Sequence, residues 1–134
     1  MSKMTLRLAV AAGVFSFGVF SLATAAFAAS MPAKTATTAK GEIFVNASGM
    51  TLYTFAKDSK GKSACNGPCA ANWPPLAAEA GANGAKGWSV VKRADGSAQW
   101  AYHGKPLYTF VKDTKPGDMA GDGFLNGAWH VAKP

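Results

Sequence analysis

The sequence lacks every short motif that identifies a common enzyme class. It contains no Gly-x-Ser-x-Gly, no His-Glu-x-x-His, no phosphate-binding loop and no dinucleotide fingerprint. Its 134 residues provide one small domain, which excludes a multi-domain enzyme. An enzyme whose nucleophile and base lie far apart in the sequence is still compatible with these facts, but no residue pattern selects one. The sequence therefore favours a protein without catalytic activity.

Charged residues are also scarce, at 16% of the chain, and they are biased toward positive charge. There are 14 Lys and Arg residues against 7 Asp and Glu residues, which gives a formal net charge of +7. Apart from the pair Lys92-Arg93, the basic residues of the chain beyond its apolar start come singly, as on a solvated surface. Nucleic-acid binding calls for a dense basic stripe with interleaved aromatics, so we exclude nucleic acid as a partner. Loose attraction to an anionic surface of the cell envelope is the inference that this charge supports.

The first 28 residues have the pattern of a signal peptide. Lys3 and Arg7 precede an uncharged run from Leu8 to Ala28, and small residues precede an expected cut before Ala29. A run of this length could instead anchor the chain in a membrane, but its Ala, Ser and Gly content and its Ala-x-Ala end favour cleavage. We expect a periplasmic or secreted protein with no membrane span after cleavage and, because no cysteine lies near the cut, no lipid anchor.

Residues 29–40 are expected to form a flexible tether between the signal peptide and the folded domain. The segment consists of small residues, Thr, Lys, one Met and one Pro, which bury too little apolar surface to offset the entropy of ordering. Structure should begin soon after it, with the β-prone run Ile43 to Val45. The sequence therefore predicts one folded domain over 41–134.

An internal repeat is the most informative feature of this domain. Residues 49–60 recur as residues 104–115, with eight of the twelve positions identical. Such a repeat indicates two copies of one β unit, each too small to close a core alone. The second copy follows a predicted hairpin, whose strands 88–91 and 99–102 are joined through a tight turn at Asp95-Gly96.

The rest of the domain favours strands and turns over helices. Gly, Pro, Trp, Tyr and Thr are abundant, and one helical turn at 70–72 is the only helix that we expect. The Ala- and Gly-rich stretch 77–87 is predicted to be the loop that joins the repeats, and a last strand is expected within 124–131. The predicted fold class is all-β, a small antiparallel domain built from two tandem repeats of short strands.

Both repeats contain the motif Tyr-x-Phe-x-x-Asp. In this respect the chain resembles a family of bacterial secreted repeats, described as predicted lipoproteins with a Tyr-x-(Phe/Trp/Tyr)-x-x-Asp motif. The resemblance extends to the Cys-x-x-x-Cys segment 65–76, to 100–108, to 116–118 and to the closing Trp129-His130. Many relatives carry an amino-terminal lipidation cysteine that this chain lacks, which implies a soluble exported form. The function of the family is largely unknown, so the resemblance implies compartment and fold rather than chemistry. The motif residues are Tyr53, Phe55 and Asp58 in the first repeat and Tyr108, Phe110 and Asp113 in the second.

The two cysteines, Cys65 and Cys69, are expected to form a structural disulfide. An exported chain meets oxidising conditions, and the bond would close a short loop worth about 2 kcal/mol in the chain-entropy model. A transferable redox disulfide and thiolate metal binding are the alternatives. The spacing is one residue wider than that of redox Cys-x-x-Cys motifs, and no βαβ pattern surrounds it.

The motif residues have a structural and a functional interpretation. Aromatic residues at alternating strand positions are usually core, so Tyr53, Phe55, Tyr108 and Phe110 are expected to form a paired aromatic core, with a ligand-stacking platform as the alternative. An aspartate after a strand commonly accepts backbone N–H groups in a turn. The repeat could instead bring Asp58 and Asp113 together as a paired acid–base or cation site.

Histidines are few, and they offer a weaker alternative for chemistry. His103 and His130, with Met119, are ligand types that an envelope copper or haem site would use. The histidines have no short-spacing pair, so ordinary positions in a turn or on a strand surface are favoured, and no cofactor is expected.

These observations give one main hypothesis and one alternative for function. The chain is interpreted as an exported cell-envelope binding or interaction module without catalytic activity, whose partner is an envelope component or another protein. The alternative is a periplasmic redox or metal- or haem-binding protein that uses His and Met residues or the cysteine pair. The sequence does not choose an oligomeric state.

Overall fold

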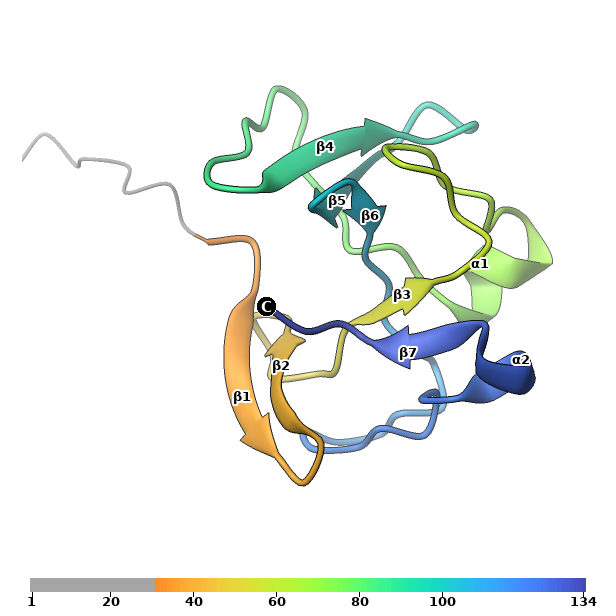
Figure 1. The fold of residues 1–134 in the computed structure, drawn as a ribbon. Coiled ribbons are helices and arrows are strands. Elements are labelled where there is room, and N and C mark those ends of the chain that lie inside the picture. Colours follow the sequence, from red (N-terminus) through yellow and green to blue (C-terminus); the bar gives the residue numbers. More distant parts are fainter. Residues whose placement is uncertain (1–30) are drawn as a thin grey trace, which may run out of the picture.

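The computed structural model describes residues 31–134 (Figure 1). The predicted signal peptide, 1–28, lies outside the described residues. Within them, no helix is long and apolar enough to cross a membrane.

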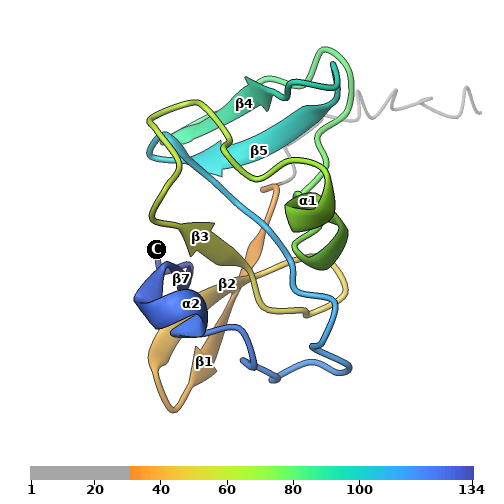
Figure 2. The same ribbon diagram turned by 90° about the vertical axis from the view of Figure 1, so that its right-hand side faces the viewer.

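Seven short strands and two helical turns make up the domain, which confirms the all-β fold class predicted from the sequence. The strands form three antiparallel sheets, β1–β2, β3–β7 and β4–β5–β6. The pair β3–β7 lies between the hairpin β1–β2 and the three-stranded sheet, and both helical turns lie on one side (Figures 1 and 2). In chain order the elements are β1 (Lys34–Thr38), β2 (Gly41–Val45), β3 (Tyr53–Phe55), α1 (Pro68–Asn72), β4 (Trp88–Lys92), β5 (Ala98–Tyr102), β6 (Lys105–Pro106), α2 (Phe124–Gly127) and β7 (Trp129–Val131).

Most elements lie where the sequence predicted them, with differences at the end of the chain. The hairpin predicted before the second copy is β4–β5, to which β6 adds a third strand, and the single predicted helical turn is the end of α1. Strand β7 occupies only the last part of the predicted strand 124–131, because α2 precedes it. Gly123 precedes that helical turn and Gly127 is its last residue, with φ of 80° and 84°, values that an extended strand does not have.

Strand β1 corrects the prediction that residues 29–40 form a flexible tether. Its five residues pair in full register with β2, from Lys34 opposite Val45 to Thr38 opposite Gly41. The side chains of β1 are exposed or half-buried, so they bury little apolar surface. Backbone pairing stabilises β1 instead, and Thr residues favour an extended chain. The folded domain therefore begins before residue 41.

The two repeats have the same architecture, and each completes the other. Each begins with a hairpin, β1–β2 or β4–β5, continues into its Tyr-x-Phe segment and ends in a closing segment after a helical turn. The closing segment of the second repeat pairs with the first, where Ala132 N–H donates to Leu52 O at 2.8 Å. The closing segment of the first repeat pairs with the second in the same way, where Leu76 N–H donates to Leu107 O at 2.9 Å. The repeats are therefore interlocked rather than merely stacked.

The approximate two-fold relation between the repeats passes between two tyrosines. Tyr53 N–H donates to Tyr108 O at 2.8 Å, and Tyr108 N–H donates back to Tyr53 O at 3.0 Å. Each tyrosine also faces the closing segment of the opposite repeat, Tyr53 opposite Val131 and Tyr108 opposite Pro75. Both tyrosines are fully buried. The centre of the domain is thus made by the two copies of the repeated motif.

Because the repeats are interlocked, we predict that neither folds alone. Residues 31–80 and residues 81–134, produced separately, should each give the circular dichroism and amide NMR dispersion of an unfolded chain, since each lacks the closing segment that covers its Tyr-x-Phe strand. Mixed in equal amounts, they should recover the dispersion of the intact protein. A well-dispersed spectrum from either half alone would contradict the interlocked arrangement.

Candidate functional site

The repeated motif holds the two halves together through hydrogen bonds that cross between repeats. Tyr53 of the first repeat donates its hydroxyl proton to Asp113 Oδ2 of the second at 2.6 Å. Tyr108 of the second donates to Asp58 Oδ2 of the first, also at 2.6 Å. Burial is the largest cause that raises the pKa of both tyrosines, and the neighbouring carboxylates raise it further. Both hydroxyls therefore stay protonated and act as donors.

Each aspartate also orders the turn that follows its own strand. Asp58 Oδ1 accepts Ala64 N–H at 2.7 Å, and Asp113 Oδ1 accepts Ala120 N–H at 2.9 Å. Burial raises the pKa of Asp58, although the hydrogen bonds from Tyr108 and from the Ala64 N–H lower it. Both oxygens of each carboxylate are thus used in holding the fold, and each aspartate binds a different tyrosine. The structure therefore supports the turn-ordering role of Asp58 and Asp113. Each aspartate also accepts a hydrogen bond from a tyrosine of the other repeat.

The aromatic motif residues end a continuous stack of four rings. Trp73 and Trp129 lie face to face at the centre, with centroids 3.8 Å apart and planes 2° from parallel. Phe110 covers the other face of Trp73 at 4.0 Å, and Phe55 covers the other face of Trp129 at 4.2 Å. Both faces of both indoles are occupied by protein rings, so neither tryptophan offers a face on which a ligand could stack. The aromatic residues of the motif form the core between the repeats.

A disulfide joins Cys65 and Cys69, with an S–S distance of 2.09 Å. Cys65 is fully buried, and its carbonyl oxygen accepts a hydrogen bond from the guanidinium of Arg93 at 2.5 Å. That guanidinium also donates to Gln99 Oε1 at 2.7 Å and to Ser63 Oγ at 3.0 Å. The disulfide loop is therefore fixed to the second repeat.

Arg93 is a residue whose role the sequence analysis missed. Beside Lys92 it resembles one of the scattered surface cations, yet only 5% of its surface is exposed. The available signal was its place two residues after buried Val91, because residues two apart in an extended chain share a face.

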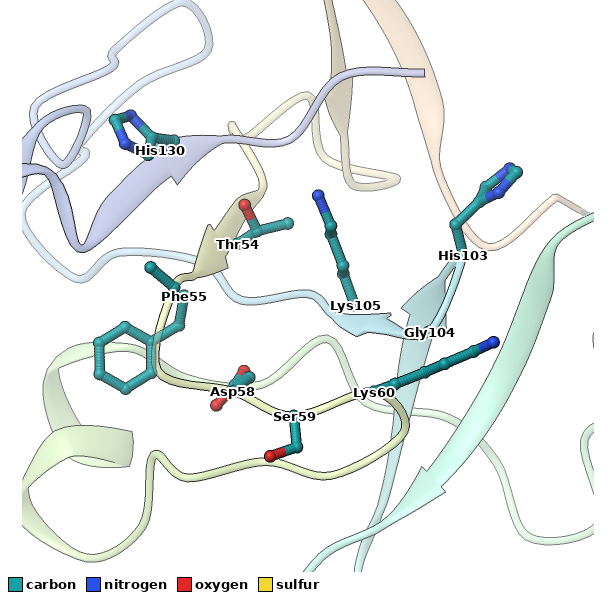
Figure 3. Close-up of a pocket in the computed structure, with 10 residues that line it drawn as sticks. Thr54, Phe55, Asp58, Ser59, Lys60, His103, Gly104, Lys105 and His130 are labelled. Carbon is teal, nitrogen blue, oxygen red and sulfur yellow. The ribbon is translucent and has the colours of Figure 1, made fainter.

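Several of the basic side chains that reach the surface line one cleft of about 420 Å³ (Figure 3). The cleft lies between β3, the turn after it, the turn that leads into β6, and β7. Lys60, His103, Lys105 and His130 line it, together with Asp58, the only carboxylate in its lining. The oxygens of Asp58 are already bonded to Tyr108 and Ala64, and within the described part of the chain Lys60 and Lys105 make no ion pair.

The basic cleft continues along β7 into two neighbouring hollows. Both are lined by His130 and Lys133, and one of them also by Lys40 and Asp122. Asp122 pairs with Lys40, and its Oδ1 lies 3.6 Å from His130 Nδ1. The Lys40 ammonium and the Val131 N–H hold the pKa of Asp122 below its ordinary value. One face of the domain thus carries a basic strip that runs from Lys60 to Lys40.

Three of the four basic residues of the cleft occupy positions at which the two repeats differ, whereas Lys60 has Lys115 as its counterpart. His103 and Lys105 flank Gly104, which has φ of 79°, as Ser48 and Met50 flank Gly49, which has φ of 82°. In the same way His130 follows Trp129, whereas Pro74 follows the equivalent Trp73. The shared scaffold repeats, but this group of polar side chains occurs once.

The residues considered as copper or haem ligands are only partly brought together. His103 and His130 line the same cleft, but Met119 is not in its lining and packs against the buried cluster around Tyr53. Among residues 31–134 no group of three or more His, Cys, Asp or Glu side chains is placed to hold a metal ion.

Comparison with known proteins agrees with the repeat seen in the fold. The model of a family described as a secreted repeat of unknown function matches residues 34–77 and 89–133. Each match starts in the first strand of a hairpin, β1 or β4, and ends in a closing segment, so the matched units are the structural repeats. No curated protein and no solved structure matched the chain.

We predict that either cross-repeat hydroxyl is worth about 1–3 kcal/mol of unfolding free energy. Tyr53→Phe keeps the ring in the core but leaves buried Asp113 without one of its donors, and Tyr108→Phe does the same to Asp58. Urea denaturation should show both losses. Tyr102→Phe is the matched control, since the Tyr102 hydroxyl bonds to no group of the described chain, and it should change stability little. Losses no larger than that of Tyr102→Phe would show that the crossed bonds do not join the repeats.

Proposed function

The chain belongs to a family of secreted repeats of unknown function, and from this premise we propose that it is an exported cell-envelope binding module without catalytic activity. Its ligand is an anionic component of the envelope, and its binding site is the basic cleft. One observation carries the proposal: His103, Lys105 and His130 stand in that cleft at positions where the other repeat has uncharged residues. The crossed Tyr–Asp bonds and the aromatic stack use residues that the repeats share, so these three residues are not needed for those contacts and are free to serve binding.

The electrostatics of the strip favour a ligand with several negative charges along its length. Four lysines, Lys40, Lys60, Lys105 and Lys133, lie along it against two carboxylates that are already bonded within the protein. Lysine ammonium groups bind phosphate as mobile point charges and need no fixed fork geometry. A cleft lined by one sign of charge also concentrates the opposite charge near it. A phosphate-bearing envelope polymer has the chemistry that this strip would recognise.

The polar groups that line the cleft support binding rather than catalysis. Its only carboxylate, Asp58, is committed to Tyr108 and to a backbone N–H, so it is not poised to transfer a proton to a ligand. The hydroxyls of Thr54 and Ser59 line the cleft and can donate to an anion. These groups suit recognition of an oxyanion.

The test is binding of a soluble glycerol phosphate oligomer to the purified protein, measured by calorimetry at low ionic strength. The double variant Lys60→Gln, Lys105→Gln removes two cations from the cleft and should weaken binding by about tenfold or more. The matched control is Lys92→Gln, Lys115→Gln, which removes the same charge elsewhere. Lys115 is the counterpart of Lys60 in the other repeat, so the control should retain most of the affinity.

Equal losses in the two double variants would show attraction to net charge without a site, which would overturn the proposal. The copper or haem alternative predicts a different result. Copper would then bind in a one-to-one ratio, and both His103→Ala and His130→Ala would abolish that binding, while the oligomer would bind weakly to every variant.

A further inference from the structure

A second cleft opens between the helical turns α1 and α2, on the side that faces the viewer in Figure 2. Its volume is about 370 Å³, within the range of small-molecule sites. In contrast to the basic cleft, its lining is mainly apolar. The aromatic stack connects the two places: Phe55 at one end lines the basic cleft, and Phe110 at the other end lines this one. Its apolar side chains include Pro68, Trp73, Phe110, Phe124, Leu125 and Trp129.

One wall of this cleft is held in a strained backbone conformation. Leu125 and Asn126 have φ of 53° and 56°, in the left-handed region that favours glycine. Among the described residues glycine stands at eleven other positive-φ positions, and Leu125 is the one large apolar side chain with a positive φ, beside Lys86, His103 and Asn126. The strained turn also leaves Leu125 61% exposed and Phe124 40% exposed, which costs apolar hydration. Strain and exposure together at one apolar turn suggest that it serves a ligand rather than the fold.

The corresponding turn of the first repeat has a different composition. There Pro68 and Cys69 stand where the second repeat has Phe124 and Leu125, and Cys69 is tied back by its disulfide. The N–H of Ala71 bonds to Gly67 O at 3.1 Å, as the N–H of Gly127 bonds to Gly123 O at 3.0 Å, which establishes the equivalence. The bulky, exposed wall therefore occurs in one repeat only, like the cations of the basic cleft.

A single cation completes the second cleft. Lys112 follows the Tyr-x-Phe segment of the second repeat, lines the cleft and is exposed, and within the described part of the chain it makes no ion pair. No carboxylate lines this cleft. An apolar hollow with one free ammonium group at its border is complementary to a molecule with an apolar body and one negative end.

We propose that the cleft between α1 and α2 binds a small anionic amphiphile, with its apolar body against Phe110, Phe124 and Leu125 and its anionic group on Lys112. This site is separate from the basic cleft, and it would hold whether or not that cleft binds a polymer. A free fatty acid and the acyl end of an anionic lipid share this chemistry.

The test is titration of the purified protein with dodecanoate below its micelle concentration, followed by tryptophan fluorescence and calorimetry. We expect one molecule to bind per chain and to change the emission, because Trp73 and Trp129 line the cleft. Lys112→Gln should weaken dodecanoate binding by about tenfold but leave binding of uncharged dodecanol unchanged. The variant Lys60→Gln, Lys105→Gln should bind dodecanoate as the original protein does, which separates this site from the basic cleft.

The strained turn provides a second variant, in which a loss of binding would not be explained by a loss of stability. Leu125→Gly removes the apolar wall and relieves the positive φ, so it should raise the thermal midpoint while weakening dodecanoate binding by about tenfold. Asn126→Gly is the matched control, because it relieves the same kind of strain without removing apolar surface. It should raise the midpoint and leave the affinity unchanged.

Three results would overturn the proposal. The first is dodecanoate affinity that is unchanged in both Leu125→Gly and Lys112→Gln. The second is equal binding of dodecanoate and dodecanol to the original protein, since Lys112 would then have no role. The third is concentration-dependent dimerisation that Leu125→Gly abolishes, because the turn would then cover a second copy of the chain. If dodecanoate binds but vesicles of anionic phospholipid do not, the ligand is a free fatty acid rather than the acyl end of a membrane lipid.

Discussion

The exchange of contacts between the two repeats is the constraint on which the rest of the structure depends. Each repeat supplies a tyrosine whose hydroxyl is held by the aspartate of the other, and each supplies a closing segment that completes the other's strand. The tryptophans at the ends of the helical turns, Trp73 and Trp129, then meet face to face. A unit of this size buries too little surface to be stable alone, so interlocking provides a core that two separate copies would lack.

The polar and aromatic groups of the motif are largely used within the protein. Its tyrosines and aspartates use their polar atoms on each other, and its phenylalanines cover the indole rings. Binding chemistry must therefore come from positions that the motif does not determine. The repeats differ at His103, Lys105 and His130 in one cleft and at Phe124 and Leu125 in the other, whereas Lys60 and Lys112 have lysine counterparts. A scaffold formed twice can therefore carry two different surfaces on the same core.

The sequence predicted the parts of the fold that depend on local pattern or on identity between the repeats. The strands, the hairpin turn at Asp95-Gly96 and the domain built from two repeats follow from alternation, turn chemistry and self-similarity. Strand β1 was missed because Thr- and Ala-rich sequence buries little, and its stability comes from pairing with β2. Arg93 was missed because a charged side chain is buried only where distant groups, here Cys65 O and Gln99, accept its hydrogen bonds.

The clefts were hidden from sequence analysis for a related reason. Lys60, Lys105 and His130 are far apart in the chain and share no motif, and they meet only because the closing segment of one repeat crosses to the other. Comparing the repeats position by position, rather than looking for what they share, would have singled out His103, Lys105 and His130. In an interlocked repeat, identity marks the contacts that hold the halves together, and departures from identity mark the surfaces that remain free to bind.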